Sequence, residues 1–249
     1  MMLLRYLSQI GKYFLMWKEI FSKQTKWSVM RVLIFKEIDD LIIGSLGIVA
    51  FISFFVGGVV AIQTALNLTN PLIPKYIIGF ATRQSVILEF APTFLSIVLA
   101  GVVGSKIASE LGNMRVSEQI DALEIMGINT KSYLILPKIL ASMLVIPCLI
   151  TLSVALGIWG GRLAGHYTGL ISTDIYDAGL RENLNTYYIN FALYKAYTFA
   201  FIISTISAYY GYYVKGGALE IGRASTSAVV VSCILILISD YILALLLLG

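Results

Sequence analysis

The stretch LIIGSLGIVAFISFFVGGVVAIQTAL, residues 41–66, contains no acidic or basic side chain. At about 1.5 Å per residue, a helix of this length is long enough to cross the roughly 30 Å hydrocarbon core of a bilayer. Four further stretches are apolar and long enough to do the same: about 84–108, 133–160, 188–214 and 228–248. Their length and their internal Gly, Ala and Ser favour helices over barrel strands of about ten residues. We therefore predict an all-α integral membrane protein with five transmembrane helices.

The composition of the whole chain excludes several other classes of protein. Of 249 residues, 58% are hydrophobic and 13% charged, and the mean hydropathy is +0.86, which does not suit a soluble surface. The net charge of +4 is small and its basic residues gather at a few places, so we expect no nucleic-acid partner. Cys148 and Cys233 lie in apolar runs and His166 is the single histidine, so we predict no disulfide framework, metal site or cofactor. No Ser- or Pro-rich linker interrupts the chain, and we predict one domain covering 1–249.

The basic residues outside the spans are divided unequally between the two sides of the predicted bundle. Thirteen fall on the first side: Arg5, Lys12, Lys18, Lys23, Lys26, Arg31, Lys36, Lys106, Arg115, Lys131, Lys138, Lys215 and Arg223. At most five fall on the other: Lys75, Arg83, Arg162, Arg181 and Lys195. Because basic loops stay on the cytoplasmic side, we expect a cytoplasmic N-terminus and place Gly249 on the opposite side.

Residues 1–36 have the pattern of an amphipathic helix lying on the membrane surface. Apolar side chains recur at helical spacing beside basic residues: Leu3, Leu7, Ile10, Phe14 and Trp17. Charged residues interrupt every candidate apolar core of a signal peptide, so we interpret this segment as an interfacial helix. A partly disordered basic tail is the alternative.

Three charged residues lie inside predicted spans, where a charge costs about 2.5–3.5 kcal/mol at the bilayer centre: Glu89, Lys195 and Asp240. Helix rise places Glu89 and Lys195 at similar depth, so we predict that they can form an ion pair. Such a pair is either structural or part of a site for a polar head group at the mouth of an apolar cavity. Lys195 could instead extend outward to the interface, and Asp240 could satisfy polar groups among the helices.

The segment between the second and third spans is the most structured polar part of the sequence. Ser117 can cap a short helix that Gly127 can end, and Glu118, Asp121 and Glu124 recur along it every three residues. The helix is too short to span a membrane and too acidic for an anionic leaflet, which favours a soluble partner. The alternative is that it covers the ends of its own helices.

No phosphate-binding loop is recognisable. The nearest match to G-x-x-x-x-G-K-[ST] is GALEIGRA, 217–224, which lacks both the lysine and the hydroxyl. The chain is therefore not expected to bind ATP by this route. Small residues at intervals of four, Gly157, Gly161 and Gly165 and also Ala100, Gly104 and Ala108, predict close helix contacts, within one chain or between two.

Five segments resemble, in order, those of the MlaE-type permeases, which are membrane subunits of ABC transporters that move phospholipids with MCE proteins. They are ASELGNMRVSEQIDALEIMGIN (108–129), LPKILA (136–141), GIWGG (157–161), GGALEIGRAST (216–226) and SDYIL (239–243). The resemblance implies a homodimeric, non-catalytic permease in the inner membrane of a Gram-negative bacterium, with a short cytoplasmic coupling helix after the second span. It further implies two cytoplasmic ATPase subunits, a hexameric periplasmic MCE protein, and a role in outer-membrane lipid asymmetry.

The charge pattern and the resemblance together give the candidate site residues. For contact with the ATPase these are Glu110, Arg115, Glu118, Asp121 and Glu124, and for lipid they are Val60, Gln63, Leu68, Glu89 and Lys195. The sequence departs from the family at Leu88, where an arginine is common, so Arg83 or Lys195 is the candidate replacement.

Three other functions remain open from the residues alone. The runner-up is an ion-coupled secondary transporter that uses Glu89, Lys195 and Asp240 as a relay. An intramembrane enzyme lacks a nucleophile–base pair, and a pure assembly scaffold predicts no bound lipid.

Overall fold

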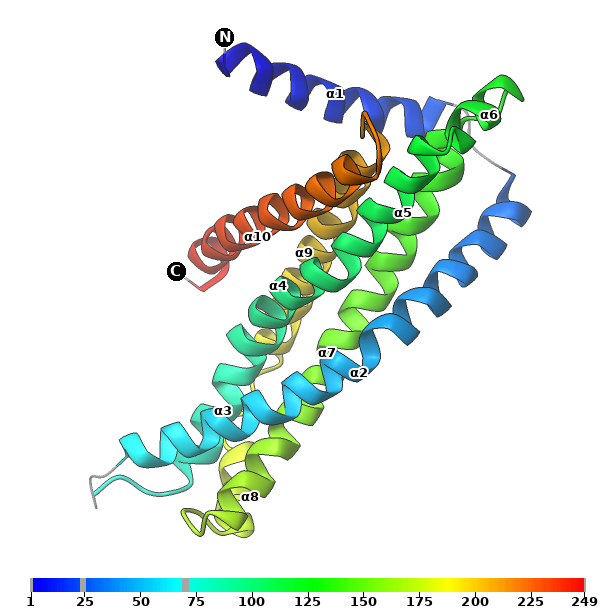
Figure 1. Cartoon of the computed structure of the whole chain (residues 1–249). Coiled ribbons are helices and arrows are strands. Elements are labelled where there is room, and N and C mark those ends of the chain that lie inside the picture. Colours follow the sequence, from blue (N-terminus) through cyan, green and yellow to red (C-terminus); the bar gives the residue numbers. More distant parts are fainter. Residues whose placement is uncertain (1, 23–25, 69–71, 249) are drawn as a thin grey trace. The chain divides into compact units, whose positions relative to one another are not determined.

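The computed structural model describes residues 2–22, 26–68 and 72–248, with the side chains of all of these except 2–7 and 248 (Figure 1). Within these ranges the chain is helical and contains no strand. The helices are α1 (Met2–Ser22), α2 (Trp27–Asn67), α3 (Ile77–Ser85), η1 (Val86–Phe94), α4 (Leu95–Leu99), η2 (Ala100–Gly104), α5 (Ser105–Val116), α6 (Gln119–Ile125), η3 (Lys131–Ile135), α7 (Leu136–Tyr167), α8 (Thr173–Arg181), α9 (Thr186–Tyr212) and α10 (Ala218–Leu248). The three η segments are π-helical turns within longer helices.

Five helical segments of the described chain are long and apolar enough to cross a membrane: Trp27–Asn67, Ile77–Val116, Lys131–Tyr167, Thr186–Tyr212 and Ala218–Leu247. The prediction of an all-α membrane protein with five spans and an N-terminal helix is therefore confirmed. Several boundaries differ from those predicted. For example, α2 begins at Trp27, whereas the apolar stretch that predicted this span begins at residue 41. An α-helix satisfies its own backbone hydrogen bonds, so it can extend beyond the apolar stretch.

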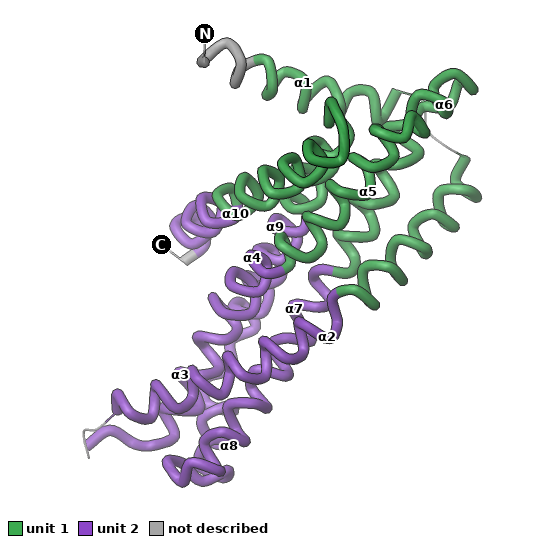
Figure 2. Tube along the Cα trace, viewed as in Figure 1, with its two compact units in different colours: residues 1–44, 99–145, 201–235 green, residues 45–98, 146–200, 236–249 purple. Residues whose placement is uncertain are grey.

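The described chain forms two compact units, and each unit takes segments from several parts of the sequence (Figure 2). Unit 1 comprises 1–44, 99–145 and 201–235, and unit 2 comprises 45–98, 146–200 and 236–249. The thirteen basic residues predicted for one side all belong to unit 1, and the other five to unit 2. Unit 1 also contains nine acidic residues and unit 2 five, so the whole net charge of +4 belongs to unit 1. The single domain remains a prediction.

Within unit 1, α1 is amphipathic, and it packs on α9. Met16 and Ile20 are fully buried, whereas Ile10 and Phe14 remain exposed. Trp17 stacks on Phe201 with 5.3 Å between ring centroids. The helix predicted near the N-terminus is present, and its location on a membrane surface stays a prediction. The side chains of Leu3 and Leu7 lie outside the described residues.

Glycines allow the long helices of unit 2 to pack backbone against backbone. A Cβ atom on Gly57 of α2 would lie 1.9 Å from the carbonyl oxygen of Gly157 in α7, and one on Gly160 would lie 2.1 Å from that of Phe54. In unit 1, a Cβ atom on Gly211 of α9 would lie 2.5 Å from the carbonyl oxygen of Ala108 in α5. The predicted small-residue contacts therefore form within one chain.

Candidate functional site

A fully buried lysine in unit 2 forms ion pairs with two carboxylates. Lys195 of α9 has 0% side-chain exposure, and its Nζ lies 2.9 Å from Oε1 of Glu89 and 2.6 Å from Oδ1 of Asp240. The carboxylates come from η1 and α10, so three helices contribute to this group. The structure thus brings together the predicted ion pair and adds Asp240 to it. The outward extension of Lys195 considered above is wrong, because the ammonium group is held inside by both carboxylates.

Lys195 also contacts a backbone carbonyl close to Pro92. The ammonium group donates a hydrogen bond to the carbonyl oxygen of Leu88, with an Nζ–O distance of 3.0 Å. Pro92, four residues later, has no N–H group, so it cannot form the usual α-helical hydrogen bond to this carbonyl. Lys195 therefore has two hydrogen-bond acceptors, Leu88 and Glu89, and a second ion pair with Asp240, which together offset the cost of burying the charge.

Sequence reasoning missed two further members of this group. The hydroxyl of Thr93 lies 3.0 Å from Oδ1 of Asp240 and 3.3 Å from Oε2 of Glu89, so it can donate to either carboxylate. The Phe191 ring faces the ammonium group, with 4.8 Å from Nζ to the ring centroid. Their spacing along the sequence, four residues after Glu89 and four before Lys195, was the available signal. We call these five side chains, Glu89, Thr93, Phe191, Lys195 and Asp240, the Lys195 cluster.

Only one edge of the Lys195 cluster is accessible. The Glu89 side chain is 51% exposed, whereas Asp240 is 17% and Lys195 0% exposed. Phe90 and Phe94, which follow Glu89 in η1, are exposed at 38% and 44%. One ammonium group against two carboxylates leaves a formal charge of −1. A carboxylate edge beside aromatic rings can accept hydrogen bonds from the polar part of an amphipathic molecule, whereas the fully buried Lys195 is not accessible to it.

A narrow, largely apolar groove lies next to Phe90 and Phe94. It is lined by residues of α2, of η1 with α4, and of α7, including Val56, Val86 and Gly157. Its volume is about 10 Å³, which is room for about one water molecule. This groove does not accommodate an acyl chain in the single protomer.

The other candidate lipid residues belong to α2 and the loop that follows it. Val60 is buried at 7% exposure, and Gln63 is exposed. Leu68 packs against a cluster that includes Ile78 and Tyr176. Burial in that cluster raises the pKa of the Tyr176 phenol above its ordinary value, so it stays neutral. Leu68 therefore stabilises the packing of unit 2 in this protomer.

Arg83 is not a free replacement for the family arginine at Leu88. Its guanidinium group is buried and donates to the carbonyl oxygens of Leu180 at 2.5 Å, Glu182 at 2.9 Å and Asn183 at 3.4 Å. These carbonyls end α8, where helical partners are missing, so Arg83 caps that helix. Since Lys195 is also fully occupied, neither candidate is available to replace the arginine.

The helix predicted between the second and third spans is α6, Gln119–Ile125, in unit 1. Gly127 follows it with φ +77° and ends it as predicted. The predicted cap by Ser117 is wrong: its hydroxyl donates to the carbonyl oxygen of Asn113 at 2.8 Å, in the last turn of α5. Glu118, with φ +59°, occupies the cap position instead and is exposed.

The remaining candidate ATPase contacts have partners inside unit 1. Arg115 and Asp121 form a 2.7 Å ion pair. Oε1 of Glu124 accepts hydrogen bonds from Thr130 at 3.1 Å and Tyr212 at 2.9 Å. Glu110 also has a partner, at 2.8 Å from Nζ of the buried Lys138.

Sequence reasoning gave no role to the apolar end of α6. Ile125 is 88% and Met126 66% exposed, so this end presents an apolar tip beside the exposed Glu118. Two consecutive large apolar residues at the end of an acidic helix were the available signal.

Comparison with known proteins decides the family. The family model described as Permease MlaE matches residues 34–246, which include most of both units. The chain belongs to the MlaE permease family. It is therefore an ABC transporter permease and a multi-pass membrane protein.

Three relatives from different organisms are similar over most of this chain. A probable ABC transporter permease protein of Rickettsia bellii is 38% identical over 245 residues, covering 96% of this chain and 92% of the relative. The chloroplastic protein TRIGALACTOSYLDIACYLGLYCEROL 1 of Arabidopsis thaliana is 36% identical over 200 residues, covering 80% and 57%. The intermembrane phospholipid transport system permease protein MlaE of Haemophilus influenzae is 28% identical over 218 residues, covering 87% and 83%.

Proposed function

We propose that this chain is the membrane subunit of an ATP-driven transporter that moves phospholipid between the inner membrane and a periplasmic MCE protein. The Lys195 cluster carries the proposal, because the exposed carboxylate of Glu89 lies beside the exposed rings of Phe90 and Phe94. A phospholipid joins a polar head group to apolar tails and matches a polar edge on an apolar wall. The phospholipid transport named for the Haemophilus influenzae relative supports the same substrate.

Glu89 is the residue of the Lys195 cluster that we assign to the head group. Its carboxylate accepts hydrogen bonds from an ammonium or hydroxyl group of the lipid, whereas Lys195 positions it from the buried side. Val60, Gln63 and Leu68 are kept as candidate wall residues that a second protomer or a bound lipid would bring into the site.

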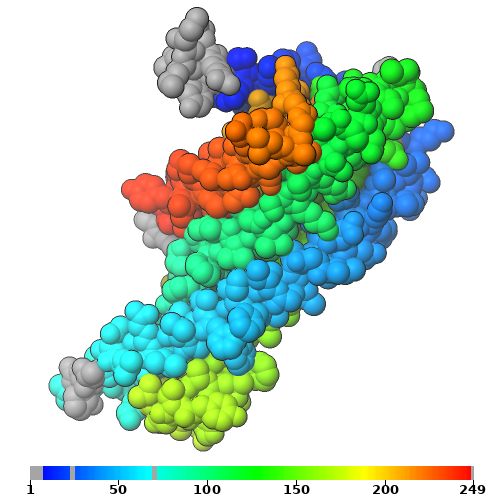
Figure 3. All heavy atoms as spheres, in the orientation of Figure 1, coloured from blue at the N-terminus to red at the C-terminus, as the bar shows by residue number. Residues whose placement is uncertain are grey.

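A homodimer completes the lipid cavity in this proposal. The groove beside Phe90 is too narrow for an acyl chain in one protomer. Only 11% of the most apolar 18-residue stretch of α10 is buried within the chain, and its exposed side chains include Val230, Leu237 and Tyr241. The orange-to-red spheres of this helix lie at the surface in Figure 3. A second copy and surrounding lipid are the partners suited to this apolar helix.

The ATPase subunits are proposed to dock on α6. The tip formed by Ile125 and Met126 offers apolar contact, and Glu118 offers charge. Arg115, Asp121 and Glu124 would then act mainly by holding α6 in place, and Glu110 by anchoring α5. The permease itself would have no catalytic residue, and ATP hydrolysis would belong to the partner.

The orientation proposed from the basic residues places unit 1 at the cytoplasm. The N-terminus is then cytoplasmic and the C-terminus periplasmic, on the side of the hexameric MCE protein. The membrane is the inner membrane of a Gram-negative bacterium, and the physiological role is the maintenance of outer-membrane lipid asymmetry.

One observation favours the alternative of ion-coupled transport. Glu89, Lys195 and Asp240 are in contact, as a relay of protons or cations would require. Membership of an ABC permease family favours ATP as the energy source instead.

Lipid transfer by the reconstituted complex tests the proposal. Proteoliposomes that contain the permease and its ATPase are loaded with fluorescent phospholipid, and transfer to or from the isolated MCE protein is followed with ATP or with an ion gradient. We expect transfer with ATP alone. Transfer that needs an ion gradient and persists without the ATPase would establish the alternative. Absence of transfer in both conditions, with phospholipid absent from the purified complex, would refute the phospholipid assignment.

The contact with the ATPase is tested separately by co-purification. Ile125→Ser combined with Met126→Ser should remove the ATPase from the permease while leaving the dimer intact. Ile10→Ser combined with Phe14→Ser in α1 is a matched control, because it also removes two exposed apolar side chains of unit 1. Undiminished recovery of the ATPase with the α6 variant would reject this docking site.

A further inference from the structure

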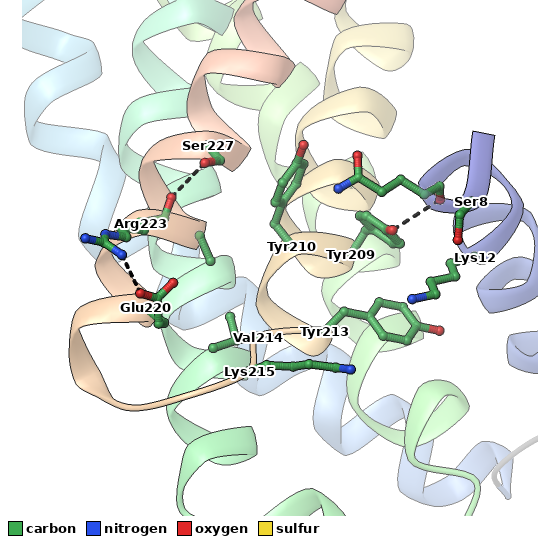
Figure 4. A pocket seen from close by; sticks show the side chains of 12 residues that line it. Ser8, Lys12, Tyr209, Tyr210, Tyr213, Val214, Lys215, Glu220, Arg223 and Ser227 are labelled. Atoms are coloured by element: carbon green, nitrogen blue, oxygen red, sulfur yellow. Dashed lines mark hydrogen bonds and ion pairs between the residues drawn. The ribbon is translucent and has the colours of Figure 1, made fainter. Parts of the chain in front are cut away.

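A cavity of about 430 Å³ lies in unit 1 between α1, the end of α9 and the beginning of α10 (Figure 4). Its volume falls within the range of about 300–1,000 Å³ that is usual for small-molecule sites. Three tyrosines and three basic residues line it: Tyr209, Tyr210, Tyr213, Lys12, Lys215 and Arg223. None of these residues belongs to the Lys195 cluster, and the proposed lipid pathway does not use them.

Two of the basic residues converge on the same space without an acidic partner. Lys12 of α1 and Lys215, in the loop after α9, extend from opposite sides toward the space beside Tyr213 (Figure 4). In the described part of the chain, neither ammonium group forms an ion pair. Arg223 differs, because its Nη1 lies 2.6 Å from Oε1 of Glu220. The lining therefore has a positive charge that the protein itself leaves uncompensated.

The part of α1 that carries Lys12 is attached to α9 by a hydrogen bond and a ring contact. The hydroxyl of the largely buried Tyr209 donates to the backbone carbonyl of Gln9, with an O–O distance of 3.1 Å. The Tyr209 ring also packs edge-on against Tyr13 of α1, at 5.8 Å between centroids, and lies 5.2 Å from the Tyr213 ring. These contacts attach α1 to α9 at the cavity and thereby position Lys12 opposite Lys215.

An apolar surface begins where the polar lining ends. Ser227 of α10 lines the cavity, and Val230 and Ile234 are three and seven residues further along the helix, on the same face. Both side chains are about half exposed, at 51% and 52%. A ligand with its anionic group in the cavity could thus place an apolar chain along α10.

We propose that this cavity binds the phosphate group of an anionic phospholipid, with Lys12 and Lys215 as the charged contacts. Two ammonium groups on different elements bind a phosphate by charge-assisted hydrogen bonds. The Tyr213 hydroxyl adds a neutral donor, and α10 accommodates an acyl chain. Binding would strengthen the attachment of α1, because Lys12 comes from that helix and Lys215 does not. The proposal needs only a membrane around the chain and does not rest on the proposed transport function.

Thermal unfolding in detergent tests the site with three probes. The purified full chain is titrated with dioleoylphosphatidylglycerol, with dioleoylphosphatidylcholine, and with water-soluble glycerol 3-phosphate. The site variant is Lys12→Gln combined with Lys215→Gln. The control variant, Lys18→Gln combined with Lys36→Gln, removes two other exposed lysines of unit 1 and leaves the cavity intact.

We expect dioleoylphosphatidylglycerol to raise the unfolding temperature of the wild type, with little effect of the other two probes. The site variant should need on the order of thirtyfold more of this lipid for the same shift, since it removes two lysines and each lysine near an anionic surface contributes about 1 kcal/mol. The control should change the requirement by less than about twofold. Equal responses of the two variants, or equal responses to the two lipids, would overturn the proposal. Stabilisation by glycerol 3-phosphate alone would replace the lipid with a soluble phosphate.

Discussion

Each unit of this permease contains one lysine buried between two carboxylates from other helices. In unit 2, Lys195 lies between Glu89 and Asp240, at 2.9 Å and 2.6 Å. In unit 1, Lys138 of α7 lies between Glu37 of α2 and Glu110 of α5, at 2.7 Å and 2.8 Å. Each group has one well-buried and one half-exposed carboxylate, and a formal charge of −1.

The surroundings of the two lysines differ more than their ion pairs. Glu110 lines an open polar cavity of about 520 Å³ together with Asp40, Lys106 and Asn113, so water can solvate it. Glu89 is followed by the exposed aromatic side chain of Phe90. The same charge arrangement is thus a hydrated structural ion pair in unit 1, whereas in unit 2 it presents a carboxylate on an otherwise apolar surface. The environment of a carboxylate, more than its partner, indicates whether it is a ligand site.

The largest effect is expected from Lys195→Met. The substitution leaves Glu89 and Asp240 facing the same space without a cation, and breaking a buried pair costs about 3–5 kcal/mol. Unfolding in detergent, followed by temperature or denaturant, measures the loss. The triple variant Lys195→Met, Glu89→Gln, Asp240→Asn should recover most of it, and a triple variant no more stable than the single one would assign the loss to shape instead of charge. Removing Glu89 alone is not enough for this rescue, because Asp240 still lacks a cation.

Lys138→Met should be less damaging, with a loss of about 1–3 kcal/mol. Glu110 can be hydrated in the open cavity, so mainly Glu37 is left buried and unpaired. The same unfolding measurement, made side by side with Lys195→Met, checks this order. If Lys138→Met proves equally destabilising, the open cavity does not relieve the stranded charge and the contrast between the two groups fails.

Close helix packing gives a second comparison between the units, with an expected loss of stability similar to that of Lys138→Met. Gly57→Ala in unit 2 places a methyl group on the backbone of Gly157, and overpacking of this kind costs about 1–3 kcal/mol or more. Gly101→Ala in unit 1 is the control, because a Cβ atom there meets no other atom within 4 Å. Unfolding temperatures should fall for the first variant and stay within experimental error for the second. A similar fall for both would mean that glycine itself, not the close approach, is needed.

The smallest effect on stability, and the most informative on function, is expected from Glu89→Gln. Glu89 is 51% exposed and Lys195 keeps Asp240, so stability should change by less than about 1 kcal/mol. Glu110→Gln is a matched control, since Glu110 is 44% exposed and also pairs with a buried lysine. Mass spectrometry of lipid extracted from the purified complexes should show less bound phospholipid for Glu89→Gln only. Equal lipid content in the two variants would remove Glu89 from the head-group site.

The charged groups show how far reasoning from sequence reached. A charge inside an apolar stretch has few ways to be tolerated, so Glu89, Lys195 and Asp240 could be singled out from hydropathy alone. The burial of Lys138 was not predicted, because Lys138 was counted among the basic loop residues that orient the chain. It lies, however, in the apolar run ILPKILASMLVI, 135–146. The same criterion applied there would have marked it.

Local patterns by themselves determined the five spans, the N-terminal helix and the end of α6 at Gly127, because hydropathy and a left-handed glycine act over a few residues. Apart from the Glu89–Lys195 pair, which helix rise predicted, the partners of the charged residues were decided only by the tertiary structure. Which carboxylate faces Lys195 depends on where the helices cross and how each is rotated about its axis. The hydrogen bond from Arg83 to the end of α8, almost a hundred residues away in the sequence, depends on helix packing in the same way. The same holds for Ser117, which its spacing predicted to cap α6. Its hydroxyl donates to the carbonyl oxygen of Asn113 instead, because the folded backbone places that acceptor within hydrogen-bond distance.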